Sequence, residues 1–365
     1  MMPKKIFILY ASAGVGHKKA AEALFSSPHF PKSGARLMDI CDFMPALPRW
    51  FYTKGYIFAI TRLVWLWTFL YFMSDTPFLR VFNVHLRRFF DSKICARLIE
   101  LIKKEGPEAV ISTQFLASEI VCYAKQKFNL KTKLITVVTD FGVHNFWINP
   151  STDVYCCASE STRAILIKKG VQESRIRVTG IPVHEKFLIP QNADALASEF
   201  GLKKDKLTVL IMTGGIGAGP IDDVVDHLKD EAQLLVVCGH NKELFDRLSQ
   251  KGYPNVRLFG FVDFVEKLMK VSDLIVTKAG GLSVAESLVM GLPMIFFYLI
   301  PGQELNNAKT MENYGAGIIT ESCEQIKAAI KRFKDNPAER TEYRKRILNI
   351  AKPNAAQEII SLLYV

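Results

Sequence analysis

Two glycine-rich loops, one near the start of the chain and one in its second half, most constrain the fold. The first loop, Tyr10–His17, follows the apolar run Ile6–Leu9, and the second, Lys278–Glu286, follows Asp273–Thr277. Each arrangement predicts a strand, a turn and a helix, which together present backbone N–H groups and the positive end of a helix dipole to phosphate. We therefore expect two α/β domains that face each other with a ligand between them.

Alternating strand and helix patterns fill most of the chain and predict a parallel sheet with helices on both faces in each half. In the first half, strands are predicted at Ile6–Leu9, Ala109–Ser112, Leu134–Thr139 and Val154–Cys157, with helices at Lys18–Phe25, Ser92–Lys104 and Ser161–Lys169. In the second half, strands are predicted at Leu207–Met212, Gln233–Val237, Val256–Phe259, Leu274–Val276 and Met294–Phe297, with helices that include Lys242–Ser249 and Ser283–Met290.

The length of the chain, 365 residues, favours two domains. We place the boundary in the region 180–190, which gives a first Rossmann-like domain at 1–182 and a second at 183–339. The remaining residues, 340–365, are predicted to be mostly helical, and they can pack back on the first domain.

The formal net charge of +11 calls for an anionic partner. The excess is concentrated in residues 1–90, which hold twelve Lys and Arg against four Asp and Glu. None of the seven cysteines forms a CxxC pair, and the first apolar run is too short for a signal peptide. These features favour reduced thiols in a cytosolic protein and do not favour a zinc site.

The segment 49–90 departs from the α/β pattern because it is aromatic and basic. It holds three of the four tryptophans, and Asp75 is its only acid. Arg62 interrupts the apolar run Ile57–Met73, which is also short for a membrane span of about 20 residues. An interfacial segment on an anionic membrane fits better, with an aromatic core or dimer interface as the alternative. Nucleic acid is not favoured because of the long apolar run. The residues selected for membrane contact are Trp50, Arg62, Trp65, Trp67, Arg87 and Arg88.

Two polar groups of the first half are candidates for proton transfer. His17 opens the helix after Gly14 and Gly16, and an imidazole has a pKa near about 6.5, so it can accept a proton at physiological pH. Asp140 follows the strand Leu134–Thr139, at the edge where parallel sheets bind ligands. It can orient a base or act as one. His144 lies in the same loop and can do either or contact a lipid headgroup, and both His144 and Trp147 are selected for the acceptor side. A helix-capping role for His17 and a local turn at Asp140 are the alternatives.

Known phosphate motifs do not match the first loop. The third glycine of GxGxxG is replaced by Lys19, and the P-loop pattern is absent. No spacing of His, Cys, Asp or Glu near Asp140 specifies a metal, and we expect neither a metal nor a cofactor.

Five predicted strand ends of the second half carry glycine-rich or polar loops, and the set is more specific than any single loop. The backbone at Phe261 and Val262 can contact a base, the amides at Lys278–Gly281 suit a diphosphate, and Glu286 suits ribose hydroxyls. The residues selected for this site are Gly214, Gly215, Gly217, His240, Phe261, Val262, Lys278, Gly280, Gly281, Leu282, Ser283, Glu286, Gln303, Glu304 and Asn307.

These motifs resemble the GT-B glycosyltransferases of family 28, and above all the monogalactosyldiacylglycerol synthases and the bacterial processive diacylglycerol glucosyltransferases. The matching motifs are Ala13–His17, Thr139–Asp140 with His144 and Trp147, Gly214–Gly217, Cys238–Asn241, Gly260–Val262, Lys278–Gly281 with Glu286, and Gly302–Glu304. The resemblance implies two Rossmann-like domains facing across a cleft, with UDP on the second. It also implies that Gln303 and Glu304 hold the hexose and that Gly14, Gly16 and His17 belong to the acceptor side.

The function expected from this resemblance is an inverting transfer of a hexose from a UDP-sugar to diacylglycerol, or to a glycosyl-diacylglycerol, at the cytosolic face of a membrane. His17 is the expected base, with Asp140 as helper or alternative. Three other functions stay open: transfer to a polyprenyl-linked cell-wall precursor, epimerisation of a UDP-sugar, and UDP-sugar sensing without catalysis. The residues leave glucose and galactose equally possible.

Overall fold

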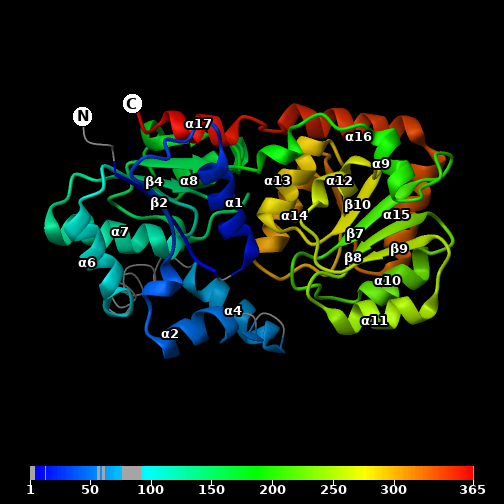
Figure 1. Cartoon of the computed structure of the whole chain (residues 1–365), viewed down its shortest axis with the longest axis horizontal. Helices are drawn as coiled ribbons and strands as arrows, with labels where there is room; N and C mark the ends of the chain where they lie inside the picture. The colour runs from blue at the N-terminus through cyan, green and yellow to red at the C-terminus, as the bar shows by residue number, and fades with distance from the viewer. Residues whose placement is uncertain (1–4, 13, 56–57, 60–61, 76–91, 365) are drawn as a thin grey trace. The chain divides into compact units, whose positions relative to one another are not determined.

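A computed structural model describes residues 5–12, 14–55, 58–59, 62–75 and 92–364. The chain divides into two compact units. The first unit comprises residues 1–184, 300–303 and 352–365, and the second comprises residues 185–299 and 304–351. Each unit is described by itself below and can be followed by colour in Figure 1.

The first unit is built on a six-stranded parallel sheet in the order β2-β1-β3-β4-β5-β6. Its strands are β1 (Ile6–Tyr10), β2 (Ala35–Asp39), β3 (Ala109–Ser112), β4 (Lys133–Val137), β5 (Val154–Cys157) and β6 (Ile176–Val178). Its helices include α1 (Val15–Ser26), α6 (Ala96–Glu105), α7 (Phe115–Phe128), α8 (Glu160–Lys168) and α17 (Ala355–Ser361).

Both faces of this sheet are buried because successive side chains of each strand point to opposite sides. Phe7 and Leu9 pack with residues of α6 and α7, whereas Ile6 and Ile8 pack with residues of α1 and α17. This two-sided burial explains the continuous apolar runs of the central strands.

The segment that holds α17 completes the first unit. Ile359 and Ile360 join the core around Ile6, and Lys133 Nζ donates to the carbonyl oxygen of Leu362 at 2.8 Å. Gly180 has φ +87°, and a Cβ there would lie 2.3 Å from Lys352 Cβ. Figure 1 shows α17, in red, beside α1.

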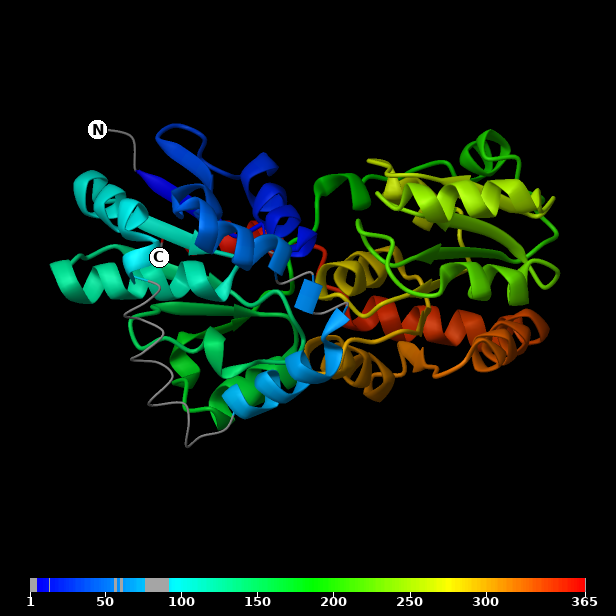
Figure 2. The same ribbon diagram turned by 90° about the horizontal axis from the view of Figure 1, so that it is seen from below.

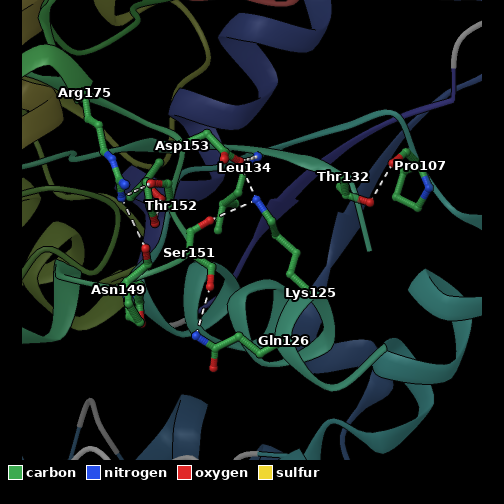
Figure 3. A network of polar contacts seen from close by, with 12 residues as sticks. Pro107, Lys125, Gln126, Thr132, Leu134, Asn149, Ser151, Thr152, Asp153 and Arg175 are labelled. Carbon is green, nitrogen blue, oxygen red and sulfur yellow. Dashed lines mark hydrogen bonds and ion pairs between the residues drawn. The ribbon is translucent and has the colours of Figure 1, made fainter. Parts of the chain in front are cut away.

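Polar contacts fix the amino ends of β3, β4 and β5, as Figure 3 shows. The Asp153 carboxylate accepts from the backbone N–H of Leu134 at 2.6 Å and from Lys125 Nζ. Lys125 Nζ also donates to the carbonyl oxygen of Ser151 at 2.9 Å, which ties α7 to the loop before β5. These contacts hold the strand register at the edge opposite to the carboxyl ends.

The second unit has its own six-stranded parallel sheet, in the order β12-β11-β10-β7-β8-β9. Its strands are β7 (Thr208–Met212), β8 (Gln233–Val237), β9 (Val256–Phe259), β10 (Leu274–Thr277), β11 (Met294–Phe296) and β12 (Gly317–Ile319). Its helices are α9 (Ala193–Glu199), α10 (Ile221–Leu228), α11 (Lys242–Lys251), α12 (Val265–Lys270), α13 (Gly281–Met290), α14 (Gln303–Asn313, of which Gln303 is grouped with the first unit), α15 (Cys323–Asp335) and α16 (Pro337–Ile350).

The aromatic segment forms short helices of the first unit. They are α2 (Ala46–Trp50), the π-helical turn Phe51–Gly55 and α4 (Val64–Ser74). None of the residues of α4, all of which the structure describes, is buried. Among the described residues, no helix has the length and hydropathy needed to span a bilayer. Arg87 and Arg88 lie outside the described residues.

The predicted class, two parallel α/β sheets with covering helices, is confirmed. Four predicted strands, Ala109–Ser112, Val154–Cys157, Gln233–Val237 and Val256–Phe259, have the observed bounds. The sequence analysis missed β2, β6 and β12. All three lie at sheet edges, where a strand is only partly buried and its apolar pattern is weak.

Candidate active site

The loop after β1 brings His17 to the carboxyl edge of the first sheet. Gly14 is the N-cap of α1 and has φ +112°, a conformation that side chains disfavour. The helix then begins at Val15, so His17 lies in its first turn. No described side chain caps this helix end, which leaves its first N–H groups facing the loop.

The imidazole of His17 is held by the ends of the two next strands in the sheet. Its Nδ1 lies 2.9 Å from the carbonyl oxygen of Thr113 and 2.8 Å from Thr139 Oγ1. The Thr113 hydroxyl in turn donates to the carbonyl oxygen of His17 at 2.9 Å. A carbonyl oxygen can only accept, so we assign the proton of the neutral imidazole to Nδ1. This assignment leaves the lone pair on Nε2, where a base needs it.

Burial determines the protonation state of His17. Loss of solvent around the half-buried ring lowers the pKa of His17 below its usual value, while the Asp140 carboxylate and the Thr113 carbonyl oppose that shift. The ring centroid of Trp147 lies 6.2 Å from that of His17 and helps to enclose it. The group is therefore neutral at pH 7 and able to accept a proton.

Asp140 lies in the loop after β4 and is 4% exposed. Its Oδ2 accepts from Gln303 Nε2 at 2.7 Å, and both residues belong to the first unit. The carboxylate acts on His17 through its charge. This placement suits a group that tunes the base rather than one that replaces it.

His144, selected for the acceptor side, contacts the end of α4. It is buried, and its Nε2 lies 3.2 Å from the carbonyl oxygen of Tyr71 and 3.3 Å from Ser74 Oγ. Trp147 is also buried, whereas Trp50, Arg62 and Trp65 are exposed and Trp67 is partly buried.

In the second unit, the loops after β7 and β8 fit tightly into each other. A Cβ at Gly217 would lie 2.0 Å from the carbonyl oxygen of Cys238, and one at Gly239 would lie 2.5 Å from that of Gly215. His240 N–H donates to the Gly215 carbonyl oxygen at 2.9 Å. Only glycine fits at these close approaches, which explains the glycine-rich pattern.

An aromatic pair flanks the same edge of the second sheet. The rings of His240 and Phe261 are stacked, with centroids 4.3 Å apart and planes 11° apart, and Phe261 is 54% exposed. A flat, exposed ring beside glycine-rich loops can stack on a planar base.

The amino end of α13 forms the third part of the candidate nucleotide site. Gly280 is the N-cap, and among the described residues neither a capping side chain nor a first-turn acid satisfies the helix end. Lys278 Nζ pairs with Glu304 at 3.3 Å. A cation beside uncapped N–H groups is a typical anion site. Leu282, Ser283 and Glu286 lie on α13 and are partly buried.

Asn307 supports this loop from behind. It is fully buried, and its Nδ2 donates to the Ala279 carbonyl oxygen at 2.9 Å. Thr213, at the start of the β7 loop, has a buried hydroxyl without a hydrogen-bond partner among the described residues.

The sequence analysis missed two residues near these sites. Thr113 contacts His17, and the only signal for it was the polar run Ser112–Gln114 after a buried strand. Tyr298 has φ +50°, and a Cβ on Gly219 would lie 2.8 Å from its ring. No sequence pattern pointed to Tyr298.

Comparison with protein families gives two matches. The model described as monogalactosyldiacylglycerol (MGDG) synthase matches residues 17–183, and the glycosyltransferase family 28 C-terminal domain matches residues 208–359. The processive diacylglycerol beta-glucosyltransferase of Bacillus licheniformis is 27% identical over 371 residues, which cover 98% of this chain and 94% of the relative. The enzyme of the same name from a Bacillus cereus strain is 26% identical over 376 residues, covering 98% and 93%.

Solved structures share the fold. Acinetobacter baumannii MurG aligns with a TM-score of 0.62 at 18% identity, over 99% of both chains. Anabaena Alr3699/HepE in complex with UDP-glucose aligns with a TM-score of 0.59 at 13% identity, also over 99% of both chains.

Proposed function

The chain belongs to the family 28 glycosyltransferases of the GT-B fold, and from that premise we propose that it transfers a hexose from a UDP-sugar to diacylglycerol with inversion at the anomeric carbon. The observation that carries the proposal is the His17 imidazole, whose Nδ1 lies against a carbonyl oxygen and whose Nε2 is left as the base. Full-length relatives named glucosyltransferases favour glucose over galactose.

The proposed reaction needs one base and one stabilised leaving group. Nε2 of His17 removes the proton of the acceptor hydroxyl as its oxygen attacks the anomeric carbon. The bond from that carbon to the diphosphate oxygen breaks, and UDP leaves with the electron pair. His17 becomes cationic in this step, and the charge of Asp140 stabilises the imidazolium.

The second unit supplies the proposed donor site. N–H groups at the start of α13 and the Lys278 ammonium neutralise the diphosphate, so the proposal includes no metal or cofactor. The uracil ring stacks on Phe261, and Glu286 accepts from the ribose hydroxyls. Glu304, already beside Lys278, contacts the hexose.

The acceptor is a lipid, and we propose that the chain meets it at the cytosolic face of a membrane. Trp65 is 72% exposed, and Phe69, Leu70 and Phe72 on the same helix are also exposed. Arg62 precedes these side chains and can pair with anionic headgroups. A helix that exposes such rings without spanning a bilayer suits the interface.

The test is direct product analysis. The purified chain is incubated with UDP-glucose or UDP-galactose and anionic vesicles that contain diacylglycerol, and the lipids are identified by mass spectrometry. Glycosyl-diacylglycerol with inverted anomeric configuration is expected. Epimerised UDP-sugar without glycolipid would replace the proposal with an epimerase, and binding of UDP-sugar without any product would indicate a sensor. A product formed only with a polyprenyl acceptor would change the lipid class.

A further inference from the structure

We infer that Asp75 is a positioning residue that connects the exposed helix α4 to the loop behind His17, so that contact of α4 with a membrane raises the turnover of the site. The inference rests on the proposed function, which supplies the lipid surface and the reaction. It assigns a role to the one acid in the aromatic, basic segment 49–90.

The carboxylate of Asp75 forms the centre of a polar contact at the end of α4. Its Oδ1 accepts from the backbone N–H of Asn145 at 2.8 Å and from Lys169 Nζ at 2.8 Å. The Asn145 side chain closes the arrangement, because its Nδ2 donates to the Asp75 carbonyl oxygen at 2.7 Å and its Oδ1 accepts from Lys169 at 3.0 Å. A charged, partly buried contact of this kind fixes position more firmly than an exposed surface pair.

Aromatic side chains reinforce the same contact. The Tyr71 ring lies 4.6 Å from that of His144, which lies 4.2 Å from that of Phe146. The Tyr71 ring also lies against Gly302, where a Cβ would approach its Cδ1 to 2.6 Å. Figure 2 shows α4, in light blue, beside green ribbon of the first unit.

The fixed loop continues directly into the surroundings of the base. Asn145–Trp147 forms one 3-10 turn, and its Trp147 ring lies 6.2 Å from the His17 ring. At the other end of the loop, Thr139 contacts His17 Nδ1. A shift of α4 therefore displaces two of the groups that lie against the imidazole.

The charge pattern supports a role inside the molecule. Arg49, Lys54 and Arg62 are cations of the same segment 49–90. An acid on the outer face of that segment would repel an anionic headgroup. The Asp75 carboxylate is directed to Asn145 and Lys169 instead. The segment thus offers an apolar and cationic surface while its single acid holds the loop.

The experiment compares Asp75→Ala and Asp75→Asn with Asp42→Asn, a matched control. Asp42 pairs with Arg49 at 2.9 Å, and among the described residues no hydrogen bond or ion pair links it to the loop 139–147, so its loss removes an exposed ion pair. For each variant, kcat and KM are measured with diacylglycerol in anionic vesicles and with a short-chain acceptor free of vesicles. Vesicle flotation, UDP affinity and thermal unfolding are measured in parallel.

The expected result is a selective loss of activation. Asp75→Ala should bind vesicles and UDP like the unmodified chain, yet its kcat with vesicles should fall by about tenfold, as expected for a misplaced base. Asp75→Asn should recover part of the rate, because its Oδ1 still accepts from Asn145 N–H. Asp42→Asn should keep full activation. If Asp75→Ala fails to fold, Lys169→Met removes the same ion pair from its other side.

The outcomes separate the two proposals. Equal kcat for Asp75→Ala and the unmodified chain on vesicles would overturn the inference, and so would a rate that falls equally with and without vesicles. Glycolipid synthesis that never depends on vesicles would also overturn it while leaving the proposed function intact. Absence of any glycolipid from the unmodified chain would remove the proposed function itself.

Discussion

The Nδ1 atom of His17 lies 2.9 Å from the carbonyl oxygen of Thr113, although 96 residues separate the two in sequence. Because β1 and β3 are neighbours in the sheet, the loops after them meet at one edge. A backbone carbonyl oxygen accepts hydrogen bonds and does not donate them. A substitution of the Thr113 side chain leaves this oxygen in place. The tautomer of the proposed base is thus determined by the fold.

Replacing His17 with alanine should remove the proposed base without disturbing the donor site. We expect kcat to fall by about 100- to 10,000-fold, the usual contribution of a general base. UDP affinity, measured by calorimetry, should change by less than about twofold, since His17 belongs to the first unit. A rate within a few-fold of the unmodified enzyme would remove His17 from the mechanism.

The pH dependence of turnover should report the environment of His17. Since burial lowers its pKa, the neutral form persists to more acidic solution, and the acid limb of kcat/KM should lie below about 6.5. Asp140 raises this pKa, so Asp140→Asn should move the limb to still lower pH. A limb that stays in place or moves to higher pH in this variant would contradict the proposed pairing.

A substitution at Gly217 should disrupt the two interlocked loops of the second unit, and Gly252 offers a matched control. The two glycines have similar φ, +64° and +60°, but a Cβ on Gly217 would lie 2.0 Å from the Cys238 carbonyl oxygen, whereas one on Gly252 meets nothing within 4 Å. Gly252→Ala should cost about 1 to 2 kcal/mol through its backbone alone. Gly217→Ala should cost clearly more and abolish UDP binding, as measured by chemical unfolding and calorimetry. Equal stability losses would show that the close approach is not rigid.

The stacked pair of His240 and Phe261 predicts a selective effect on the donor. Phe261→Ala removes a ring that is half exposed, so thermal stability should change little. The KM for UDP-sugar should rise by about two- to twelvefold, in line with about 0.5 to 1.5 kcal/mol for an aromatic contact, while kcat stays nearly constant. Phe261→Tyr is the control that keeps the ring. A fall in kcat at unchanged KM would place Phe261 at the reacting sugar instead.

The central strands and the glycine-rich loops could be predicted from sequence because their cause is local. Runs such as Leu234–Val237 are apolar throughout, since both faces of the sheet are covered. Edge strands such as β12 have weaker patterns because only part of each is buried. Their pairing depends on a neighbouring strand that sequence does not reveal.

The site differs from the one that the motifs predicted, both in the role of a selected residue and in residues that were not selected. Asn307 was selected as a donor contact, yet it is fully buried and holds the Ala279 carbonyl oxygen. Tyr298 has a positive φ, +50°, which its residue type does not predict. Thr113 contacts the His17 ring through its carbonyl group, which every residue has, so the polar run Ser112–Gln114 was only a weak signal for it. Contacts that backbone atoms make across the sheet can be identified only when the fold is known.

The core of the first unit is complete only when residues 352–365 are present, because α17 in this segment packs on the strand that begins at Ile6. Since a ribosome makes residues 185–351 before that segment, the second unit can finish folding while one face of the first sheet is still incompletely covered. A nascent chain halted before Lys352 should therefore recruit chaperones to its first unit, which residues 352–365 complete once they have been synthesised.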